Sequence, residues 1–243
     1  MFADHNADAT SFQRYRALMQ LSLMAPRSEA ELMARAEALA GRVLRDVAAV
    51  VSMPVPADLR HHKGWVGHLV ERALGASAAS RDEPDFVGLD VELKTLPVDE
   101  RGHALESTFV CTVPLREIGE VDWAESRVRR KLARVLWIPI EGMRHKPLGD
   151  RRVGAPLLWS PTREQEEALR FDWEELAGVI GRGDIESLTG HLGRHLQVRP
   201  KAAHGGVRAR SIDAEGGMLE TLPRGFYLRA QFTEAILRQA FGG

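Results

Sequence analysis

Two carboxylates and a lysine follow one another in the stretch DFVGLDVELKT, which runs from Asp85 to Thr95. Glu92 and Lys94 stand two residues apart, so on a strand their side chains leave the same face, about 7 Å apart at the backbone. A bend near Gly88 could bring the carboxylate of Asp85 beside that of Glu92. Two such oxygens suit Mg²⁺, which binds one or two carboxylates and completes its shell with water and substrate phosphate.

The lysine gives the two carboxylates a more specific meaning. A cation beside metal-bound water can lower the water's pKa, orient it for attack, or stabilise charge that grows on a phosphate. A structural pair of carboxylates does not need it. The plain alternative is a solvated strand face on which Glu92 and Lys94 merely pair, and for an isolated D-x6-E-x-K match this alternative is favoured. The spacing alone therefore does not establish a site.

The strand that carries these residues alternates in polarity. Val91, Leu93 and Thr95 share one face, and Glu92 and Lys94 share the other with Asp90, so we expect one buried face and one chemical face. Turn-forming residues, PVDERG, follow the strand, and the strand-like ALESTFVCTVPL comes next. We expect these two strands to form a hairpin at the centre of the sheet.

Helical and extended segments alternate along the rest of the chain. Ser28 and Glu31 form a capping box that opens a helix, and Gly41 can end it. Mixed α and β structure is the expectation. The further segments are a short helix over residues 43–51, a helix in GWVGHLVERALGA, a basic helix in ESRVRRKLA, extended pieces in RVLWIPI and VGAPLLWS, a long helix from the Thr162 and Gln165 cap to Val179, a strand in PRGFYLRAQF and a closing helix into Phe241.

Composition limits the classes of partner and site. Among 243 residues, 33 Lys and Arg stand against 34 Asp and Glu, so any nucleic-acid site must be a local patch. Cys111 is the one cysteine, which excludes an internal disulfide and a cysteine-rich zinc site and suits a reducing cytosol. No apolar run reaches the roughly 20 residues that a membrane span needs, and no secretory signal opens the chain, so we expect a cytoplasmic protein.

Seven motifs together resemble one known family. In order and spacing they are similar to the MutH family, the strand-nicking endonucleases of methyl-directed mismatch repair, and the match runs from about Ser28 to Phe241. Such agreement over most of the chain is far more specific than any one motif. The motifs are KGWVGHLVERALGAS, DFVGLDVELKTLPVD, ESTFVCTVPL, RKLARVLWIPIEG, RRVGAPLLWSP, QVRPKAA and TLPRGFYL.

The resemblance implies both a fold and an activity. The fold would be α/β, with a restriction-endonuclease-like mixed β-sheet flanked by helices and two lobes around a DNA-binding cleft. Residues 1–25 would be an N-terminal extension, and residues 26–243 a single endonuclease domain with two lobes, acting as a monomer. The enzyme would use Mg²⁺ to nick the unmethylated strand of double-stranded DNA just before the G of a hemimethylated GATC site. ATP-bound MutL would activate it after MutS has found a mismatch.

The same resemblance assigns catalytic roles. Asp85, Glu92 and Lys94 match the catalytic motif, and Glu71 matches a helix acid that supports the metal site, so the implied metal ligands are Asp85, Glu92 and Glu71. From the sequence alone, an exposed helix glutamate is the simpler reading of Glu71. Lys63 matches a lysine near the active site and DNA, although alone it would read as a surface lysine at a helix end.

A cluster of cations in RVRRKLAR is the first candidate for phosphate contact. A charge run is usually a solvated face, but in a DNA enzyme each neutralised phosphate adds salt dependence to binding. The resemblance places Lys131 close to the scissile backbone. The cluster comprises Arg127, Arg129, Arg130, Lys131 and Arg134.

Sequence recognition is expected in VRPK and GFYL. Arg199 can bind a guanine edge with two hydrogen bonds, Lys201 can reach a base or a phosphate, and the ring of Tyr227 can lie against an adenine N6. The resemblance assigns methyl discrimination to Tyr227 and places Phe109 near DNA. The alternative for both aromatic residues is a place in the core.

Some attractive features carry no function in this reading. His191 and His195 have helical spacing but lack the glutamate of a metalloprotease motif, so we expect two surface histidines. Cys111 reads as a buried strand residue. Arg229 and Ala230 depart from the family pattern, which has two basic residues there.

Two rival functions stay open: a stand-alone GATC restriction endonuclease that cuts both strands, and a catalytically silent reader of GATC methylation.

Overall fold

The chain forms two compact units, which are described separately. The computed structural model describes residues 24–59, 62–78, 82–188, 190–201, 209–212 and 217–242. Unit 1 comprises residues 1–105, 134–159 and 237–243, and unit 2 comprises residues 106–133 and 160–236. The expected extension over residues 1–25 lies, except for its last two residues, outside the described residues.

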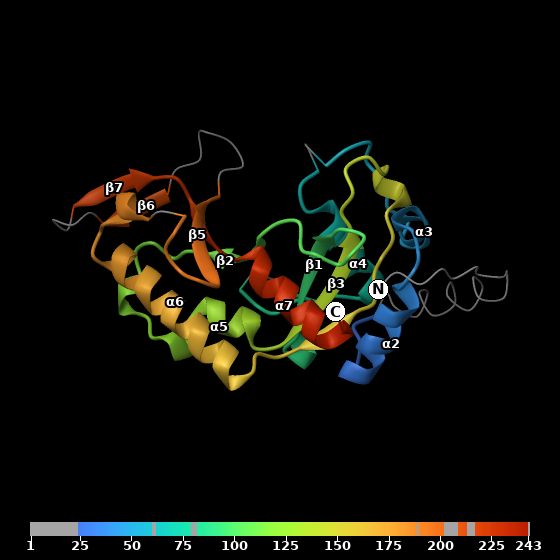
Figure 1. The fold of residues 1–243 in the computed structure, drawn as a ribbon, viewed down its shortest axis with the longest axis horizontal. Coiled ribbons are helices and arrows are strands. Elements are labelled where there is room, and N and C mark those ends of the chain that lie inside the picture. Colours follow the sequence, from blue (N-terminus) through green and yellow to red (C-terminus); the bar gives the residue numbers. More distant parts are fainter. Residues whose placement is uncertain are drawn as a thin grey trace. The chain divides into compact units, whose positions relative to one another are not determined.

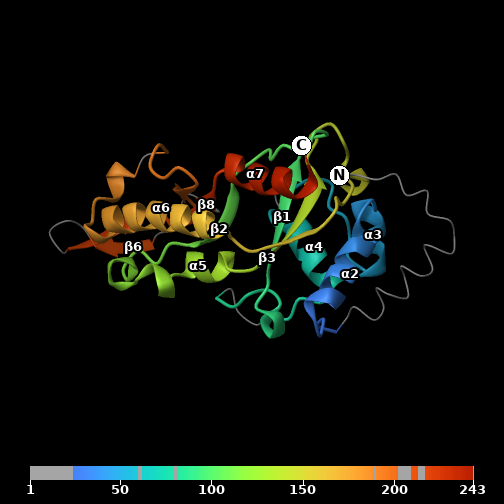
Figure 2. The same ribbon diagram turned by 60° about the horizontal axis from the view of Figure 1, so that its bottom comes forward.

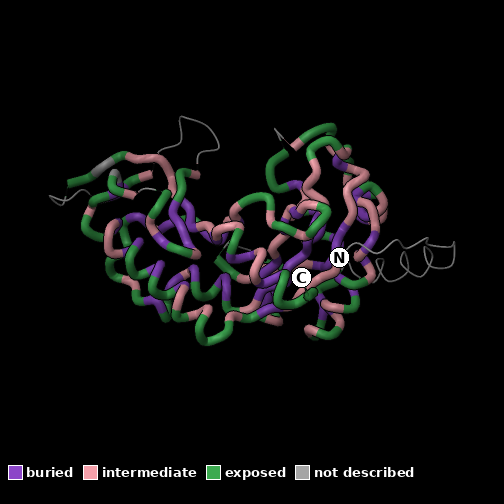
Figure 3. Tube along the Cα trace, in the orientation of Figure 1, coloured by how far each residue is buried: buried purple, intermediate pink, exposed green. Residues whose placement is uncertain are grey.

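Unit 1 is built on a mixed three-stranded sheet with the order β1-β3-β4, and Figure 1 labels its strands β1 and β3. β1 (Glu92–Val98) runs parallel to β3 (Val135–Glu141), and β4 (Leu157–Trp159) runs antiparallel to β3. β3 is buried from its first residue to Ile140, as the purple tube in Figure 3 shows. This confirms RVLWIPI as a buried strand, and burial on both faces is typical of a strand paired in parallel.

Three helices cover one face of this sheet. They are α2 (Glu29–Leu39), α3 (Leu44–Val50) and α4 (Trp65–Leu74), which gather on one side of β1 and β3 in Figure 2. Their buried residues form one core cluster with Leu93 of β1 and with Leu136 and Ile138 of β3. On the alternate face of β1, Leu96 and Val98 pack with Leu237 of α7 (Ala230–Phe241). Both faces of β1 therefore contribute to the core.

The helix ends of unit 1 carry the expected signals in part. The Glu31 side chain accepts the Arg27 N–H at 2.9 Å, so only the Ser28 half of the predicted Ser28–Glu31 capping box is present. The Ser28 side chain caps α2 by accepting a hydrogen bond from the Glu31 backbone N–H at 3.1 Å. Gly75 ends α4 in the left-handed conformation, with φ 78°, which glycine adopts without a steric penalty. Gly75 therefore sets the C-terminal end of α4, and α4 packs against β1.

Unit 2 contains an antiparallel sheet with β8 at its centre. β8 (Arg224–Leu228) pairs with β2 (Thr108–Thr112) on one side and with β5 (Leu196–Pro200) on the other. The 19-residue helix α6 (Arg163–Gly181) packs against β5, and its Thr162–Gln165 capping box is confirmed. The remaining elements are α5 (Arg127–Leu132), the hairpin of β6 (Ala209–Ile212) and β7 (Met218–Thr221), and the short 3-10 helices η2 (Ile118–Glu120), η3 (Trp123–Glu125) and η5 (Ile185–Ser187), with η1 (Val87–Leu89) and η4 (Leu148–Asp150) in unit 1.

The predicted hairpin between the first two strands is wrong. The PVDERG segment does turn, since the Gly102 N–H donates to the Asp99 carbonyl at 3.1 Å, but β1 takes β3 as its partner. β2 pairs with β8 in the other sheet. The sequence shows the turn and not the partner, because the residue that pairs with Glu92 in β1 is Val135, which lies far beyond any local turn.

Other expectations are confirmed or corrected by burial. The mixed α/β class with helices flanking the sheets is confirmed, while the DNA cleft between lobes stays a prediction. Cys111 is buried in β2, as expected. His191 is exposed, but His195 is partly buried against Phe232, with ring centroids 5.2 Å apart, so the prediction of two surface histidines is wrong for His195. Within the described ranges, no helix has the length and apolar character to cross a bilayer.

Candidate active site and nucleic-acid interface

Asp85, Glu92 and Lys94 meet at the start of β1. The Glu92 side chain is buried, and its Oε1 lies 2.5 Å from Lys94 Nζ. Asp85 Oδ2 accepts a hydrogen bond from the Leu93 backbone N–H at 2.7 Å. The predicted juxtaposition of Asp85 with Glu92 is thus present within unit 1.

A tight loop brings Asp85 back to the strand. The Phe86 N–H donates to the Val91 carbonyl at 2.9 Å, and η1 fills the space between these residues. Asp90 completes the loop with φ 53°, a left-handed conformation that aspartate tolerates better than most residues. Phe86 is buried, so the loop is anchored in the core while Asp85 meets β1.

The electrostatics of the pair favour a bound cation. Burial, followed by the charge of Glu92, raises the pKa of Asp85 to about 6, and the more distant charge of Glu71 acts in the same direction. The Leu93 N–H and the Lys94 ammonium oppose this shift. A carboxyl group whose ionised form is disfavoured by burial and by a neighbouring carboxylate is stabilised in that form by a divalent cation. The donor chemistry of Asp85 and Glu92 therefore fits Mg²⁺.

Glu71 stands apart from that pair. It is partly exposed on α4, 3.7 Å from His68 Nδ1, and a Cβ atom added to Gly67 would lie 3.9 Å from Glu71 Oε1 and 4.0 Å from Thr95 Oγ1. By strand alternation Thr95 faces away from Glu92. No group of three His, Cys, Asp or Glu residues is placed to hold a metal in the part of the chain that is described. Lys63 is exposed just before α4.

Arg134 has a role that the sequence did not reveal. Its carbonyl accepts the Glu92 N–H at 2.9 Å, and its guanidinium binds Glu29 with Nε–Oε1 and Nη2–Oε2 distances of 2.8 and 2.6 Å. This pairing holds the pKa of Glu29 below its usual value. Arg134 was expected in a phosphate-binding cluster. In the structure its guanidinium instead links Glu29 of α2 to the residue that precedes β3, beside Glu92.

The basic helix α5 is likewise partly engaged within unit 2. Ser126 caps it by accepting the Arg129 N–H at 3.1 Å, and Arg129 Nε lies 2.8 Å from Glu166 Oε1 of α6. Lys131 is buried, whereas Arg130 is exposed. The helix is present as predicted, but its cations are not equally available to a phosphate.

Three side chains form a row across the sheet of unit 2. Tyr227 of β8 stands opposite Phe109 of β2 and Gln197 of β5, and directly opposed residues of antiparallel strands share a face. The rings of Phe109 and Tyr227 meet edge to face, with centroids 5.4 Å apart and planes at 65°. Gln197 Nε2 donates to Ser107 Oγ at 2.8 Å.

Two cations lie near these aromatic rings: Arg199, which is in β5, and Lys201, which directly follows β5. Arg199 Cζ lies 5.8 Å from the Tyr227 ring centroid, and Lys201 Nζ lies 3.7 Å from the Phe109 centroid and 3.3 Å from Thr112 Oγ1. Burial raises the pKa of Tyr227, so its hydroxyl keeps its proton near neutral pH. We call Phe109, Arg199, Lys201 and Tyr227 the recognition cluster.

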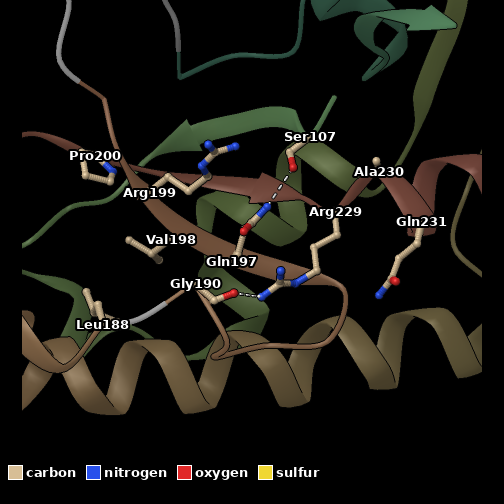
Figure 4. Close-up of a pocket in the computed structure, with 10 residues that line it drawn as sticks. All are labelled: Ser107, Leu188, Gly190, Gln197, Val198, Arg199, Pro200, Arg229, Ala230 and Gln231. Carbon is tan, nitrogen blue, oxygen red and sulfur yellow. Dashed lines mark hydrogen bonds between the residues drawn. The ribbon is translucent and has the colours of Figure 1, made fainter. Parts of the chain in front are cut away.

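A polar groove of about 600 Å³ adjoins the cluster in unit 2. Figure 4 shows Arg199, Gln197 and Ser107 on one of its walls. Arg229 also lines the groove, but its guanidinium donates to the carbonyls of Gly190, Leu192 and Gly193 at 2.6 to 3.0 Å. Arg229 therefore holds a loop of the groove wall. Among the groove residues, Gln197 was missed by the sequence argument, although its two-residue spacing from Arg199 indicates a shared face.

Comparisons with known proteins show to which family the chain is similar. A family model described as DNA mismatch repair enzyme MutH matches residues 74–172. A protein named DNA mismatch repair protein MutH from Pectobacterium atrosepticum is 52% identical over 218 residues, which cover 90% of this chain and 94% of that protein. Proteins of the same name from Klebsiella pneumoniae (strain 342) and Escherichia coli (strain K12 / DH10B) are 52% and 51% identical, over 89% and 90% of this chain and 94% and 96% of those proteins.

Proposed function

The chain belongs to the MutH family of DNA mismatch repair enzymes, and we propose that it is a Mg²⁺-dependent endonuclease that nicks the unmethylated strand at hemimethylated GATC sites. The observation that carries this proposal is the meeting of Asp85, Glu92 and Lys94 at the start of β1. A pair of coupled carboxylates beside an ammonium group suits hydrolysis of a phosphodiester.

The chemistry divides among the residues of unit 1. Asp85 and Glu92 would hold Mg²⁺, which when bound supplies a more acidic water and neutralises phosphate charge. The Lys94 ammonium, fixed by Glu92, orients the attacking water or stabilises the charge on the phosphate. Glu71 supports the arrangement through its charge from α4. Water attacks phosphorus directly, the bond from phosphorus to one sugar oxygen breaks, and that oxygen leaves as a hydroxyl after taking up a proton from solvent, so no covalent intermediate with the protein forms.

Recognition is proposed for the cations and aromatic rings of unit 2. Arg199 donates to a guanine edge, Lys201 to a base or phosphate, and Tyr227, beside Phe109, detects methylation of adenine N6. Lys131 and, from unit 1, Lys63 contact the DNA backbone. The groove beside Arg199 supplies polar groups of the kind that base edges pair with.

The proposed setting is cytoplasmic mismatch repair. ATP-bound MutL would activate the enzyme after MutS has found a mismatch, and the enzyme itself would act as a monomer. ATP belongs to the partner in this scheme, so nucleotide dependence is expected only when MutL is present.

A gel assay on circular DNA with one GATC site tests the proposal. The DNA is prepared unmethylated, hemimethylated or fully methylated and incubated with Mg²⁺, with and without MutL and ATP. We expect nicks in the unmethylated strand alone, more nicking with the partner, and none on fully methylated DNA. Double-strand cuts that ignore MutL would instead favour a stand-alone restriction enzyme, and binding without cleavage would favour a silent reader.

Two variants connect the reaction to the residues. Glu92→Ala and Lys94→Ala should abolish nicking while leaving the fold and DNA binding largely intact, because recognition is assigned to other side chains. Circular dichroism and a DNA-binding titration serve as controls. Nicking by Glu92→Ala at the unsubstituted rate would overturn the assignment of the site.

A further inference from the structure

Gly225 occupies the middle of the recognition face. It stands opposite Thr112 of β2 and Arg199 of β5 in the sheet register. Because it lies two residues before Tyr227 on β8, both residues belong to the same face of the sheet. In the sheet, Phe109 is paired with Tyr227, Arg199 is paired with Gly225, and Lys201 follows the end of β5. The four residues of the recognition cluster thus lie at or next to these two pairs.

Two aromatic rings fill the space that a side chain at this position would need. A Cβ atom on Gly225 would lie 2.8 Å from Phe109 Cε2 and 3.1 Å from Tyr227 Cε2. Gly225 is not among the residues with positive φ, so the backbone itself does not require glycine. The absence of a side chain at Gly225 is what lets the Phe109 ring lie across β8.

The position of the rings sets the position of the cations. Lys201 Nζ sits over the Phe109 ring, and the Arg199 guanidinium sits near the ring of Tyr227. Cations are attracted to aromatic faces within about 6 Å of the centroid. If the Phe109 ring is displaced, the position of the Lys201 ammonium group changes, and so does the edge-to-face contact between Phe109 and Tyr227.

We propose that Gly225 is a positioning residue for DNA recognition. Because Gly225 has no side chain, the Phe109 ring has room to lie against Tyr227 and beneath Lys201. Gly225 touches no DNA itself in this scheme. The inference deepens the proposed function and rests on it for the meaning of the recognition cluster. Both rings are only partly buried, so an added methyl group shifts them more easily than it disrupts the core.

Binding of Gly225→Ala to two DNA duplexes tests the proposal. One duplex carries a hemimethylated GATC site and the other a scrambled site. We expect about a tenfold or greater loss of affinity for GATC, from an overpacking cost of the usual size, and a much smaller loss for the scrambled duplex. The nicking preference for hemimethylated over fully methylated DNA should fall too, and the DNA concentration needed for half-maximal nicking should rise by a larger factor than the maximal nicking rate falls.

Gly178→Ala is the matched control. Gly178 lies in α6 of the same unit, and an added Cβ there would meet only the movable end of the Arg182 side chain, at 3.3 Å. This variant should bind both duplexes as the unsubstituted protein does. Equal GATC affinity and equal methylation preference for Gly225→Ala and Gly178→Ala would overturn the proposal.

A thermal unfolding cycle separates the positioning claim from the proposed function. The midpoint temperature is measured for Gly225→Ala, Phe109→Ala and the double variant. Because Phe109→Ala removes the ring that the new methyl group meets, Gly225→Ala should lower the midpoint less in the Phe109→Ala background. Strictly additive shifts would overturn the inference even if GATC nicking is found. Coupling without any GATC preference in the unsubstituted protein would sink the proposed function instead and leave the packing role in place.

Discussion

Asp85 is the residue whose environment most strongly alters its chemistry. Its pKa is raised to about 6 because burial and the Glu92 charge disfavour its ionised form. The proton is therefore held more tightly in the folded chain than in the unfolded chain. The stabilisation linked to this proton is complete below the ordinary value of 3.8 and is lost as the pH rises through about 6. The ionised Asp85 carboxylate therefore works against folding stability at neutral pH.

The substitution Asp85→Asn tests that relation in the metal-free protein. An amide keeps an oxygen for the Leu93 N–H but removes the charge beside Glu92, so the variant should be more stable at pH 8, by up to about 2 kcal/mol. The gain should shrink toward pH 5, where Asp85 is itself protonated. Urea unfolding in the presence of a chelator at both pH values measures this. A gain independent of pH would show that the raised pKa is not its source.

The Asp85–Lys94 stretch shows how far spacing alone predicts a site. Period-two alternation placed Glu92 and Lys94 on one face, and their contact follows from it. The same rule predicted one buried face and one chemical face, but Glu92 on the chemical face is itself only 4% exposed, and that face continues into Leu96 and Val98, which are buried. The pattern could not show this, because burial of that face depends on Leu237 of α7, far along the chain.

At the scale of elements, α6 holds the strand that carries the recognition residues. Asp172 of α6 is buried and accepts the backbone N–H groups of Arg194, His195 and Leu196 at 2.9, 2.5 and 2.8 Å. The last of these residues begins β5. A single carboxylate thus fixes where the strand starts, and with it the side-chain alternation that places Gln197 and Arg199 on one face.

Removal of this carboxylate should destabilise unit 2. Asp172→Ala leaves buried donors unpaired, so we expect the free energy of unfolding to fall by about 2 to 4 kcal/mol. Glu175→Ala is the matched control, since Glu175 is exposed and accepts one N–H, from Gly193 at 3.2 Å, and its loss should cost less than about 1 kcal/mol. Chemical denaturation measures both. Equal losses would mean that the Asp172 contacts do not fix β5.

Local patterns predicted most elements, but the one strand pairing predicted from them was wrong. The capping signal at Thr162 and the apolar run before Glu141 depend on neighbours in sequence, and both predictions hold. The hairpin failed because a parallel partner is reached only through a long connection, here residues 99–134, most of which belong to unit 2. The role of Gly225 was hidden for the same reason, since it depends on the register of three strands.

At the scale of the molecule, the residues proposed for chemistry and those proposed for recognition fall in different units. Asp85, Glu92 and Lys94 belong to unit 1, whereas Arg199 and Tyr227 belong to unit 2. The chain crosses between the units at residues 105/106, 133/134, 159/160 and 236/237, so the units are not consecutive segments. We therefore expect substitutions in each unit to affect different kinetic constants although neither unit is a separable piece of sequence.

Two substitutions test this division. Lys94→Ala should remove nicking while the dissociation constant for GATC DNA changes by less than about threefold, because the ammonium group acts on the reacting phosphate. Arg199→Ala should weaken GATC binding by about tenfold or more, the value of one good bidentate base contact, and lower the nicking rate at saturating DNA much less. Single-turnover nicking and equilibrium titration give the two constants. A reversal of this pattern would contradict the assignment of roles to units.

The balance of charge over the whole chain leads to the last prediction. With a formal net charge of -1, attraction to DNA cannot come from the protein's overall charge, so it must come from a few placed cations. Each phosphate contact contributes about 0.9 to the slope of log affinity against log salt. If Lys201 contacts a phosphate, Lys201→Ala should reduce that slope by the contribution of one contact, about 0.9. Arg163→Ala removes an equal charge from the surface of α6, where Arg163 pairs with Glu167, and should leave the slope unchanged. DNA-binding titrations between low and physiological salt measure the slope for both variants. Equal slopes would mean that binding depends on the total charge of the protein and not on the recognition cluster.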